Sequence, residues 1–316
     1  MKIAVIFGGR SAEREVSLNS GTQIMAALSS LGYEVSGFDL LPSIFNDIRA
    51  FDPDVVFLGL HGRYGEDGTI QGALELMGYP YVGSGVLASA LAIDKAQTKR
   101  MLSTLNLPMP AHRLARMRDL EIIDQFSQEA ESALGLPLII KPNREGSTIG
   151  LTLATSHDQV VAGITDALKY DETVLVEEYI SGTEVTVVLF GDTALPTVLG
   201  IIEIIPKSTL YDYDSKYLDG GSQHIVPARL PEQLYQQVEE YAKQAYQLIG
   251  CQDYARVDMI ISKKGPYILE VNTLPGMTAT SLVPDAARYS GYSFSEFLDL
   301  LISRAYARSK QETTQI

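Results

Sequence analysis

The feature that most constrains the fold is a pair of short segments, residues 255–261 and 267–272, in which apolar and polar side chains alternate. A period of two is the pattern of a β-strand, whose successive side chains point to opposite faces. The linking sequence Lys-Lys-Gly at 263–265 is short and contains a glycine. The pattern therefore predicts an antiparallel hairpin with one polar and one apolar face.

The register of this hairpin gives its polar face a chemical character. If the turn centres near Lys264, Asp258 lies opposite Glu270. Arg256 then lies opposite Asn272. Two carboxylates and an amide oxygen suit Mg²⁺, and a guanidinium suits a site where negative charge develops on oxygen. The alternative is an ordinary surface ion pair, which the matched spacing disfavours. The apolar face, expected to pack on a core, comprises Val257, Met259, Leu269 and Val271.

Composition excludes several classes of partner. The 316 residues carry a net charge of −14 and a sequence pI of about 4.7, which disfavours binding to nucleic acid and to anionic membranes. The only cysteine, Cys251, fits a reducing compartment and is expected to be a buried thiol. No apolar run is long enough for a membrane helix, and the N-terminus does not resemble a signal peptide. We therefore expect a cytoplasmic protein.

Residues 1–93 alternate strand and helix patterns, which is typical of a parallel, Rossmann-like α/β sheet covered by helices. Ligands of such sheets bind outside the carboxyl ends of the strands. The loops at 8–17 and 61–68 are expected there. The predicted strands are 3–7, 34–39, 55–60 and a short one near Tyr81, and the predicted helices are 16–31, 43–50 and 69–77.

The rest of the chain is predicted to form two further units, 94–182 and 183–316. A polar loop rich in tyrosine and glycine, about 206–222, has the composition of an active-site lid, and the tail from residue 310 is expected to fray. The central unit is expected to contain a helix at 94–105, strands at 138–141, 151–154 and up to 178, and a helix at 157–168. The third is expected to contain strands at 184–190 and 197–205, a helix at 232–249, the hairpin and two C-terminal helices.

Several other positions are candidates for anion or ligand binding, each with a plain structural alternative. The loop at 141–150 could close its backbone N–H groups over phosphates, with Lys141 as a cation, or could be a simple glycine turn. Lys95 could reach phosphate or be solvated. Glu177 and Glu178 could accept hydrogen bonds from the amino group of a base or from ribose hydroxyls, or they could be the solvated end of a strand.

Three more residues lie where the predicted topology would bring a ligand. Glu15 follows the first glycine turn, at the start of a predicted helix. The helix dipole could stabilise its carboxylate there, or the carboxylate could hold a substrate ammonium. His61 follows the third strand among glycines, although most loop histidines are inert. Gly276 places an N–H group beyond the polar face of the hairpin, as a partial oxyanion hole requires.

Taken together, these motifs resemble the D-alanine–D-alanine ligases of the ATP-grasp superfamily. The resemblance runs in the family's order from the start of the chain to about Arg288, and its specificity lies in the whole set. The motifs are GGRSAEREVS at 8–17, HGRYGEDG at 61–68, KPNREGS at 141–147, YDYDSKY at 211–217, RVD at 256–258 and EVNTLPGMT at 270–278.

The resemblance implies an N-terminal α/β domain followed by a two-part ATP-grasp fold, and an ATP-dependent synthesis of D-alanyl-D-alanine for peptidoglycan through an acyl phosphate. It implies ATP, two D-alanines and two Mg²⁺ ions, which Mn²⁺ could replace, and a homodimer. The implied metal ligands are Asp258, Glu270 and Asn272. The implied nucleotide residues are Lys95, Lys141, Lys216, Glu177, Glu178, Ile180 and Glu184. The implied catalytic and substrate residues are Glu15, Ser147, Tyr217, Arg256, Gly276, His61, Ser281 and Leu282.

Other functions remain open from the sequence. Within the resemblance, Tyr217 favours a dipeptide over a D-lactate product, whereas D-serine as second substrate is harder to exclude. A nicotinamide-dependent dehydrogenase is disfavoured because the first turn lacks the full G-x-G-x-x-G pattern. A non-catalytic nucleotide-binding regulator is disfavoured because no implied metal ligand or phosphate lysine is missing.

Overall fold

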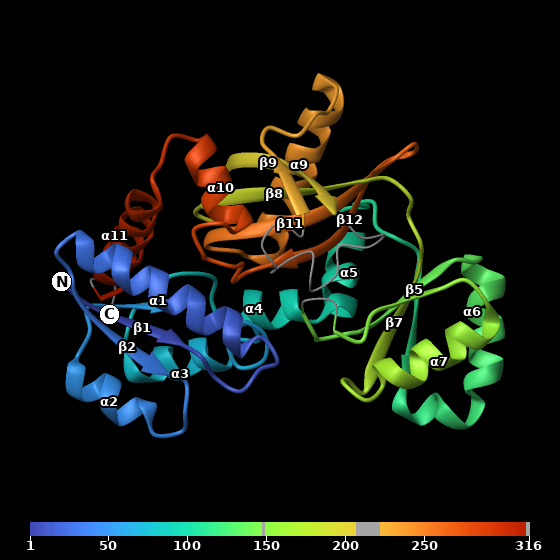
Figure 1. The fold of residues 1–316 in the computed structure, drawn as a ribbon, viewed down its shortest axis with the longest axis horizontal. Coiled ribbons are helices and arrows are strands. Elements are labelled where there is room, and N and C mark those ends of the chain that lie inside the picture. The colour runs from blue at the N-terminus through green and yellow to red at the C-terminus, as the bar shows by residue number, and fades with distance from the viewer. Residues whose placement is uncertain (147–148, 207–221, 314–316) are drawn as a thin grey trace.

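The structure is a computed structural model that describes residues 1–146, 149–206 and 222–313. Its strands form three sheets, one near the N-terminus and two that follow it in the chain (Figure 1). None of the helices it describes combines the length and the apolar character needed to cross a bilayer.

The N-terminal sheet is parallel, as predicted, with strand order β2-β1-β3. Strand β1 is buried at its four central positions and β3 at every position, whereas the edge strand β2 has no fully buried residue. The predicted strand near Tyr81 is only a single parallel bridge to Val56. The elements of this region are β1 (Lys2–Phe7), α1 (Arg14–Ser30), β2 (Glu34–Asp39), α2 (Ile44–Phe51), β3 (Val55–Leu58) and α3 (Thr69–Met77).

Two short helices then lead away from this sheet. Helix α4 (Val86–Ile93), which the sequence analysis missed, and α5 (Lys95–Ser103) contact each other and β12. The alanines of α4, Ala88 and Ala92, belong to the core of the C-terminal sheet. The predicted boundary at residue 93 separates two helices that share this core; the domain limits themselves remain a prediction.

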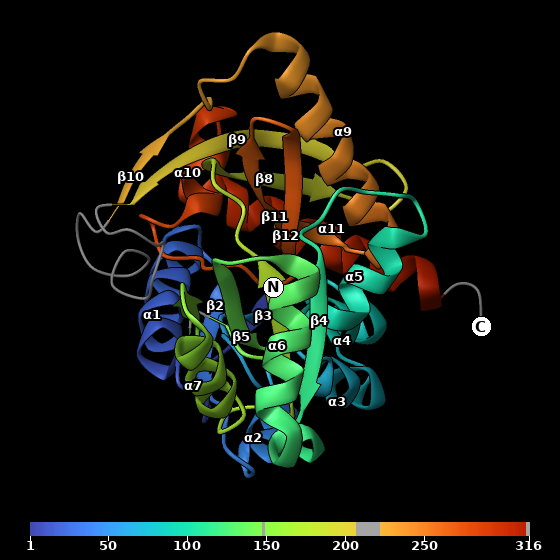
Figure 2. The same ribbon diagram turned by 90° about the vertical axis from the view of Figure 1, so that its right-hand side faces the viewer.

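The central unit is a four-stranded antiparallel sheet in the order β4-β7-β5-β6, backed by two helices (Figure 2). Strand β4 and helix α6 were not predicted from the sequence. Helix α6 fully buries only Ser127 and Ala130, and its apolar residues Ile123, Phe126 and Leu134 are partly buried against the same core. The elements are β4 (His112–Arg116), a 3-10 helix (Met117–Ile122), α6 (Ile123–Leu134), β5 (Leu138–Pro142), β6 (Thr152–Ala154), α7 (His157–Ala167) and β7 (Thr173–Glu178).

The C-terminal sheet is antiparallel, with order β10-β9-β8-β11-β12. Helix α9 covers one face and α10 the other, because alternate side chains of β8 point to opposite cores: Val187 faces α9 and Val188 faces α10. The elements are β8 (Thr183–Gly191), β9 (Thr197–Pro206), β10 (Ser222–Ile225), α9 (Glu232–Ile249), β11 (Asp253–Ser262), β12 (Gly265–Asn272), α10 (Leu282–Tyr289) and α11 (Phe294–Thr313).

The C-terminal helix returns to the N-terminal sheet. Helix α11 contacts α1 and β3, and its residues join the N-terminal core (Figure 1). The expectation of a frayed tail from Lys310 is wrong for residues 310–313, which continue this helix. Cys251 is fully buried, as expected, and burial raises the pKa of its thiol to about 12.

The hairpin has the predicted pairing, with one deviation. Asp258 pairs with Glu270 and Arg256 with Asn272, as expected. Beyond Asp258 a β-bulge shifts the register, so that Met259 faces Ile268. The prediction that Leu269 faces the core is therefore wrong, because the bulge sends Ile268 into the core and leaves Leu269 beside Glu270 on a cavity wall.

Candidate active site

Two adjoining cavities lie where the three sheets meet. The larger, about 370 Å³, lies between the N-terminal strand ends, the tip of β12 and the start of α10. The smaller, about 150 Å³, lies between the central and C-terminal sheets. Lys95, Gly146 and Glu270 line both cavities, so the two form one continuous site.

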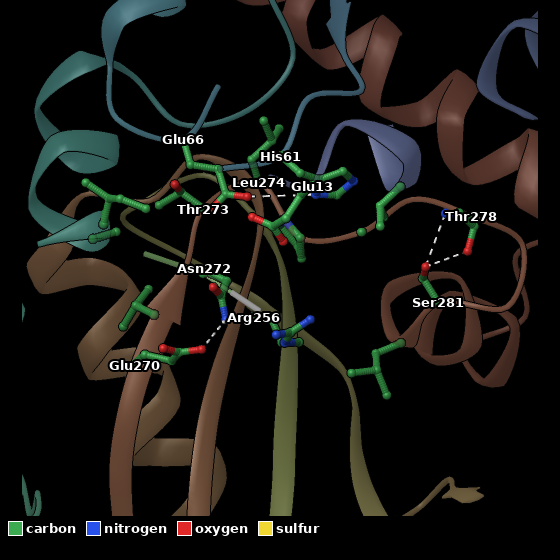
Figure 3. Close-up of a pocket in the computed structure, with 18 of the residues that line it drawn as sticks. Glu13, His61, Glu66, Arg256, Glu270, Asn272, Thr273, Leu274, Thr278 and Ser281 are labelled. Atoms are coloured by element: carbon green, nitrogen blue, oxygen red, sulfur yellow. Dashed lines mark hydrogen bonds and ion pairs between the residues drawn. The ribbon is translucent and has the colours of Figure 1, made fainter. Parts of the chain in front are cut away.

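The polar face of the hairpin forms the junction of the two cavities. Arg256 makes a two-pronged ion pair with Asp258, from Nε to Oδ1 at 2.8 Å and from Nη2 to Oδ2 at 2.9 Å. Asn272 Nδ2 donates to Asp258 Oδ2 at 3.0 Å. The same nitrogen lies 3.4 Å from Glu270 Oε1 (Figure 3). The four predicted side chains thus form one hydrogen-bonded group on adjacent strands.

This group fits a divalent cation by the chemistry of its donors. Within the described ranges no three His, Cys, Asp or Glu side chains gather as a metal cluster. The hairpin instead offers two carboxylates and an amide, Asp258, Glu270 and Asn272. Mg²⁺ is usually held by one or two carboxylates together with substrate phosphates, so this set is sufficient when a phosphate ligand completes it.

A buried ionic cluster borders the smaller cavity. Glu177, a buried residue of β7, forms ion pairs with two lysines: Lys99 Nζ lies 2.5 Å from its Oε1 and Lys141 Nζ lies 2.6 Å from its Oε2. Burial alone would raise the pKa of the Glu177 carboxyl, but the two ammonium groups outweigh burial and lower it. Desolvation lowers the pKa of Lys99, whereas Glu177 and Glu270 raise that of Lys141 against the effect of burial.

Lys95 lies at the junction of the two cavities, beside the hairpin. It begins helix α5, which Asp94 caps by accepting from Gln97 N at 3.0 Å. The Lys95 ammonium donates to the backbone oxygen of Glu145 at 2.7 Å and lies 3.7 Å from Glu270 Oε2. Two lysines, Lys95 and Lys141, therefore flank the junction of the cavities.

The N-terminal strand ends supply the opposite wall of the larger cavity. His61 is buried, with Nε2 3.2 Å from Ser20 Oγ and Nδ1 3.8 Å from Glu66 Oε1. Glu13 projects into the same space (Figure 3). A Cβ atom at Gly62 would lie 2.8 Å from Glu13 Oε2, and one at Gly146 would lie 3.0 Å from it. Glycines at both positions therefore leave room for this carboxylate.

Glu13 is the functional candidate that sequence reasoning missed. It is 5% exposed, whereas Glu15 is an exposed residue at the rim of the cavity. Helix α1 begins at Arg14, so Glu13 is its N-cap and Glu15 is its second residue. Side chains two apart on a helix point about 200° from each other. The signal was present in the first acid of the Glu-Arg-Glu sequence, and the predicted helix start at residue 16 concealed it.

The start of α10 closes the larger cavity. Ser281, its N-cap, accepts a hydrogen bond from Thr278 N at 3.2 Å, and its hydroxyl lies 2.7 Å from Thr278 Oγ1 (Figure 3). A Cβ at Gly276 would lie 3.1 Å from Ser281 Oγ and 3.8 Å from His61 Cε1. The backbone at Gly276 therefore passes close to the side chains of Ser281 and His61, and this position favours a small residue.

All predicted site residues that the structure describes line one or both cavities. Those of the larger cavity are Glu15, His61, Arg256, Asn272, Gly276, Ser281 and Leu282. Those of the smaller cavity are Lys141, Glu177, Glu178, Ile180, Glu184 and Asp258, while Lys95 and Glu270 belong to both. Ser147, Lys216, Tyr217 and most of the predicted lid lie outside the described residues.

Comparison with known proteins agrees with this arrangement. The family described as "D-ala D-ala ligase C-terminus" matches residues 101–303, and "D-ala D-ala ligase N-terminus" matches 2–43 and 42–84. The D-alanine–D-alanine ligase of Halalkalibacterium halodurans is 47% identical over 96% of this chain and 98% of its own length. The chain belongs to the D-alanine–D-alanine ligase family.

Solved structures of ligases support the same assignment. The D-alanine–D-alanine ligase of Bacillus anthracis in complex with ATP has a TM-score of 0.84 at 34% identity, covering 99% of both chains. The VanG D-Ala:D-Ser ligase of Enterococcus faecalis has a TM-score of 0.81 at 33% identity, covering 96% of this chain and 99% of its own. These neighbours confirm the predicted class, an N-terminal α/β domain followed by an ATP-grasp fold.

Proposed function

We propose that this family member is an ATP-dependent ligase that joins two D-alanines into D-alanyl-D-alanine, a peptidoglycan precursor, with release of ADP and phosphate. The observation that carries the proposal is the convergence of the predicted residues on two cavities joined at Lys95, Gly146 and Glu270. A site with a nucleotide compartment and an amino-acid compartment needs such a junction, because phosphoryl transfer occurs between the two ligands.

The smaller cavity is the proposed nucleotide compartment. Ile180 and Leu269 offer apolar surface to a base, and Glu177 and Glu184 offer carboxylates to its amino group and to ribose hydroxyls. Lys95 and Lys141 lie at the junction, where cations would neutralise phosphate charge, and Lys216 is assigned the same role from the resemblance. Catalysis of phosphoryl transfer consists mainly of such positioning and charge neutralisation.

Asp258, Glu270 and Asn272 would hold two Mg²⁺ ions, or Mn²⁺. When bound, these ions supply charge neutralisation at the transferring phosphate. The chain's own contribution is to hold the three oxygen donors on one face of a rigid hairpin. The ion pair of Arg256 with Asp258 keeps the guanidinium in the plane of this face.

In the first step, a carboxylate oxygen of one D-alanine attacks the γ-phosphorus of ATP, and the bond to the β–γ bridging oxygen breaks. The products are D-alanyl phosphate and ADP. We assign the ammonium of this D-alanine to Glu13 rather than to Glu15, because Glu13 is the buried carboxylate on the cavity wall. His61 would complete this subsite from the end of β3.

In the second step, the amine of the other D-alanine attacks the acyl carbon, and phosphate leaves as the amide bond forms. Negative charge develops on the carbonyl oxygen, where Arg256 and the Gly276 N–H would stabilise it. Ser281 and Leu282, at the positive end of α10, would receive the carboxylate of this second substrate. Ser147 and Tyr217 are assigned to substrate contact from the resemblance alone.

Phosphate release with ATP and D-alanine as the only amino acid, followed by the mass of the product, tests the proposal. We expect release that depends on D-alanine and a product with the mass of the dipeptide, and none with L-alanine. Addition of D-serine or D-lactate measures the strictness of the second site. No release with D-alanine, or a mixed product formed faster than the dipeptide, would contradict the proposal.

We further propose a homodimer and a cytoplasmic location, the second because the reaction consumes ATP. Both follow from the family resemblance. Light scattering during size-exclusion chromatography tests the first against the monomer mass of 34.5 kDa.

A further inference from the structure

Lys99 is the most deeply buried cation near the proposed nucleotide compartment. It lies on α5 with 1% of its side chain exposed, and its ammonium is 2.5 Å from Glu177 Oε1. It also donates to the backbone oxygen of Pro110, at 3.5 Å. A lysine is almost never fully buried without such a partner. Its burial therefore indicates a role that depends on Glu177.

Lys99 lies behind the carboxylate and not in the cavity. Glu177 and Lys141 line the smaller cavity, whereas Lys99 is not among the described residues that do. A carboxylate has about four lone-pair sites, two on each oxygen. With Lys99 on one oxygen and Lys141 on the other, Glu177 can still accept a donor from the cavity. The carboxylate thus faces the cavity and is held from the rear by Lys99.

The two lysines differ in what else they can reach. Lys141 borders the cavity, and its charge is also influenced by Glu270 at the junction, so it is the lysine that can turn toward a polyphosphate. Among the described residues, the close polar contacts of Lys99 are its ion pair with Glu177 and the backbone oxygen of Pro110. If Lys141 moves to phosphate, Lys99 remains as the cation that compensates a buried carboxylate. An uncompensated buried carboxylate is strongly destabilising.

We propose that Lys99 is a positioning residue for nucleotide selection: it holds Glu177 as the acceptor for the base amino group and so leaves Lys141 available to the phosphates. This inference rests on the proposed nucleotide compartment. Without Lys99, Glu177 would depend on Lys141 alone. The carboxylate would then turn toward Lys141 and away from the base. Lys141 would stay paired with the carboxylate and would be less available to the phosphates.

A double-mutant cycle tests this coupling. The variants are Lys99→Met, Glu177→Gln and both together, and the measurement is calorimetric binding of ATP and of inosine triphosphate without D-alanine. Inosine triphosphate carries a carbonyl where adenine carries its amino group, so the ratio of its dissociation constant to that of ATP reports the Glu177 contact. A hydrogen bond to a charged group contributes roughly a tenfold or larger factor in affinity.

We expect Lys99→Met to reduce the preference for ATP by about tenfold. We expect the double variant to show the same preference as Glu177→Gln alone, because Lys99 then has no carboxylate to hold. Arg100→Met, which removes an exposed cation from the same helix, is the matched control and should leave the preference unchanged. If Lys99→Met does not fold, Lys99→Gln gives the same reading, since its amide keeps a donor without the charge.

An unchanged preference in a folded Lys99 variant would overturn the inference, as would losses that add in the double variant. These readings do not depend on ligation. If Lys99→Met reduces the preference for ATP but the wild-type protein forms no dipeptide, the proposed function is contradicted and the inference stands. If the wild-type protein forms the dipeptide but the preference for ATP does not depend on Lys99, the proposed function stands and the inference is contradicted.

Discussion

The hydroxyl of Thr186 donates a hydrogen bond of 2.5 Å to Asp258 Oδ1 across the pairing of β8 with β11. Thr186 is fully buried, and Asp258 is 8% exposed. Asp258 therefore receives three donors, Thr186 from β8, Arg256 from its own strand and Asn272 from β12. Its orientation on the polar face is fixed from both neighbouring strands.

We expect Thr186→Val to raise the Mg²⁺ concentration needed for half-maximal activity without unfolding the protein. The substitution keeps the side-chain shape and removes the donor, and loss of a group that orients a metal ligand typically costs about 10–100-fold in metal affinity or activity. The measurement is the Mg²⁺ concentration for half-maximal phosphate release. Thr186→Ser, which retains the hydroxyl, is the control. Equal Mg²⁺ dependence of the valine and serine variants would count against this role.

Glu270→Gln should nearly abolish ATP turnover and leave the fold intact. The side chain lies at the junction of the two cavities and is 24% exposed, so the neutral amide is tolerated structurally. The change removes one of the two carboxylates on the polar face, and with it the charge that would hold a divalent cation. Turnover with saturating Mg²⁺ and the circular dichroism spectrum are the measurements. A variant with near-normal turnover would refute the metal assignment.

Glu13→Gln and Glu15→Gln form a matched pair that tests the proposed ammonium site. The buried carboxylate of Glu13 is expected to contribute a charge-assisted hydrogen bond, so Glu13→Gln should raise the KM for D-alanine by roughly tenfold or more. Glu15 is exposed, and its substitution should change that KM less than about twofold because solvent screens its charge. Steady-state kinetics at saturating ATP give both values. The opposite ranking would restore the assignment to Glu15.

Local patterns predicted the hairpin because its register depends on a short turn and on strict alternation. The bulge after Asp258 could not be predicted in the same way, since one extra residue leaves the alternation intact on either side of it. Its consequence is the exchange of Ile268 and Leu269 between the core and the cavity wall. The choice between Glu13 and Glu15 depended on the helix start at Arg14, and helix ends are the least certain part of any pattern.

Contacts between distant segments were also beyond reach. The buried pair of Lys99 with Glu177 joins a helix to a strand far along the chain. No local sequence pattern around either residue predicts the other as its partner. Thr186 looks like an ordinary β-branched strand residue until its register with Asp258 is known. Sequence motifs therefore located the ligand-facing residues, whereas the residues that hold them from behind required the three-dimensional structure.

Two histidines with opposite pKa shifts predict opposite contributions to the pH dependence of stability. His157, the first residue of α7, contacts two acids of α6, with Nδ1 2.7 Å from Glu131 Oε1 and Nε2 2.9 Å from Asp124 Oδ1. Both nitrogens can donate only when the ring is protonated. The hydrogen bonds to Asp124 and Glu131 therefore raise the pKa of His157 above its ordinary value. His112, on β4, has its pKa lowered, first by burial and then by the charge of Lys99.

The sign follows from proton binding in the two states. A raised folded-state pKa stabilises the protein fully below the unfolded value of about 6.5, and this contribution is lost as pH rises through the folded pKa. A lowered pKa destabilises the protein as pH falls below about 6.5. His157→Gln should thus lower the urea midpoint relative to wild type more at a pH of about 5.5 than at about 8.5. The urea midpoint of His112→Gln, relative to that of wild type, should instead be higher at the lower pH than at the higher pH. Urea titrations at both pH values, repeated in high salt to screen the exposed His157 cluster, separate the two effects. If the difference in urea midpoint from wild type changed with pH in the same direction for both variants, the ion pairs of His157 would not be formed in solution.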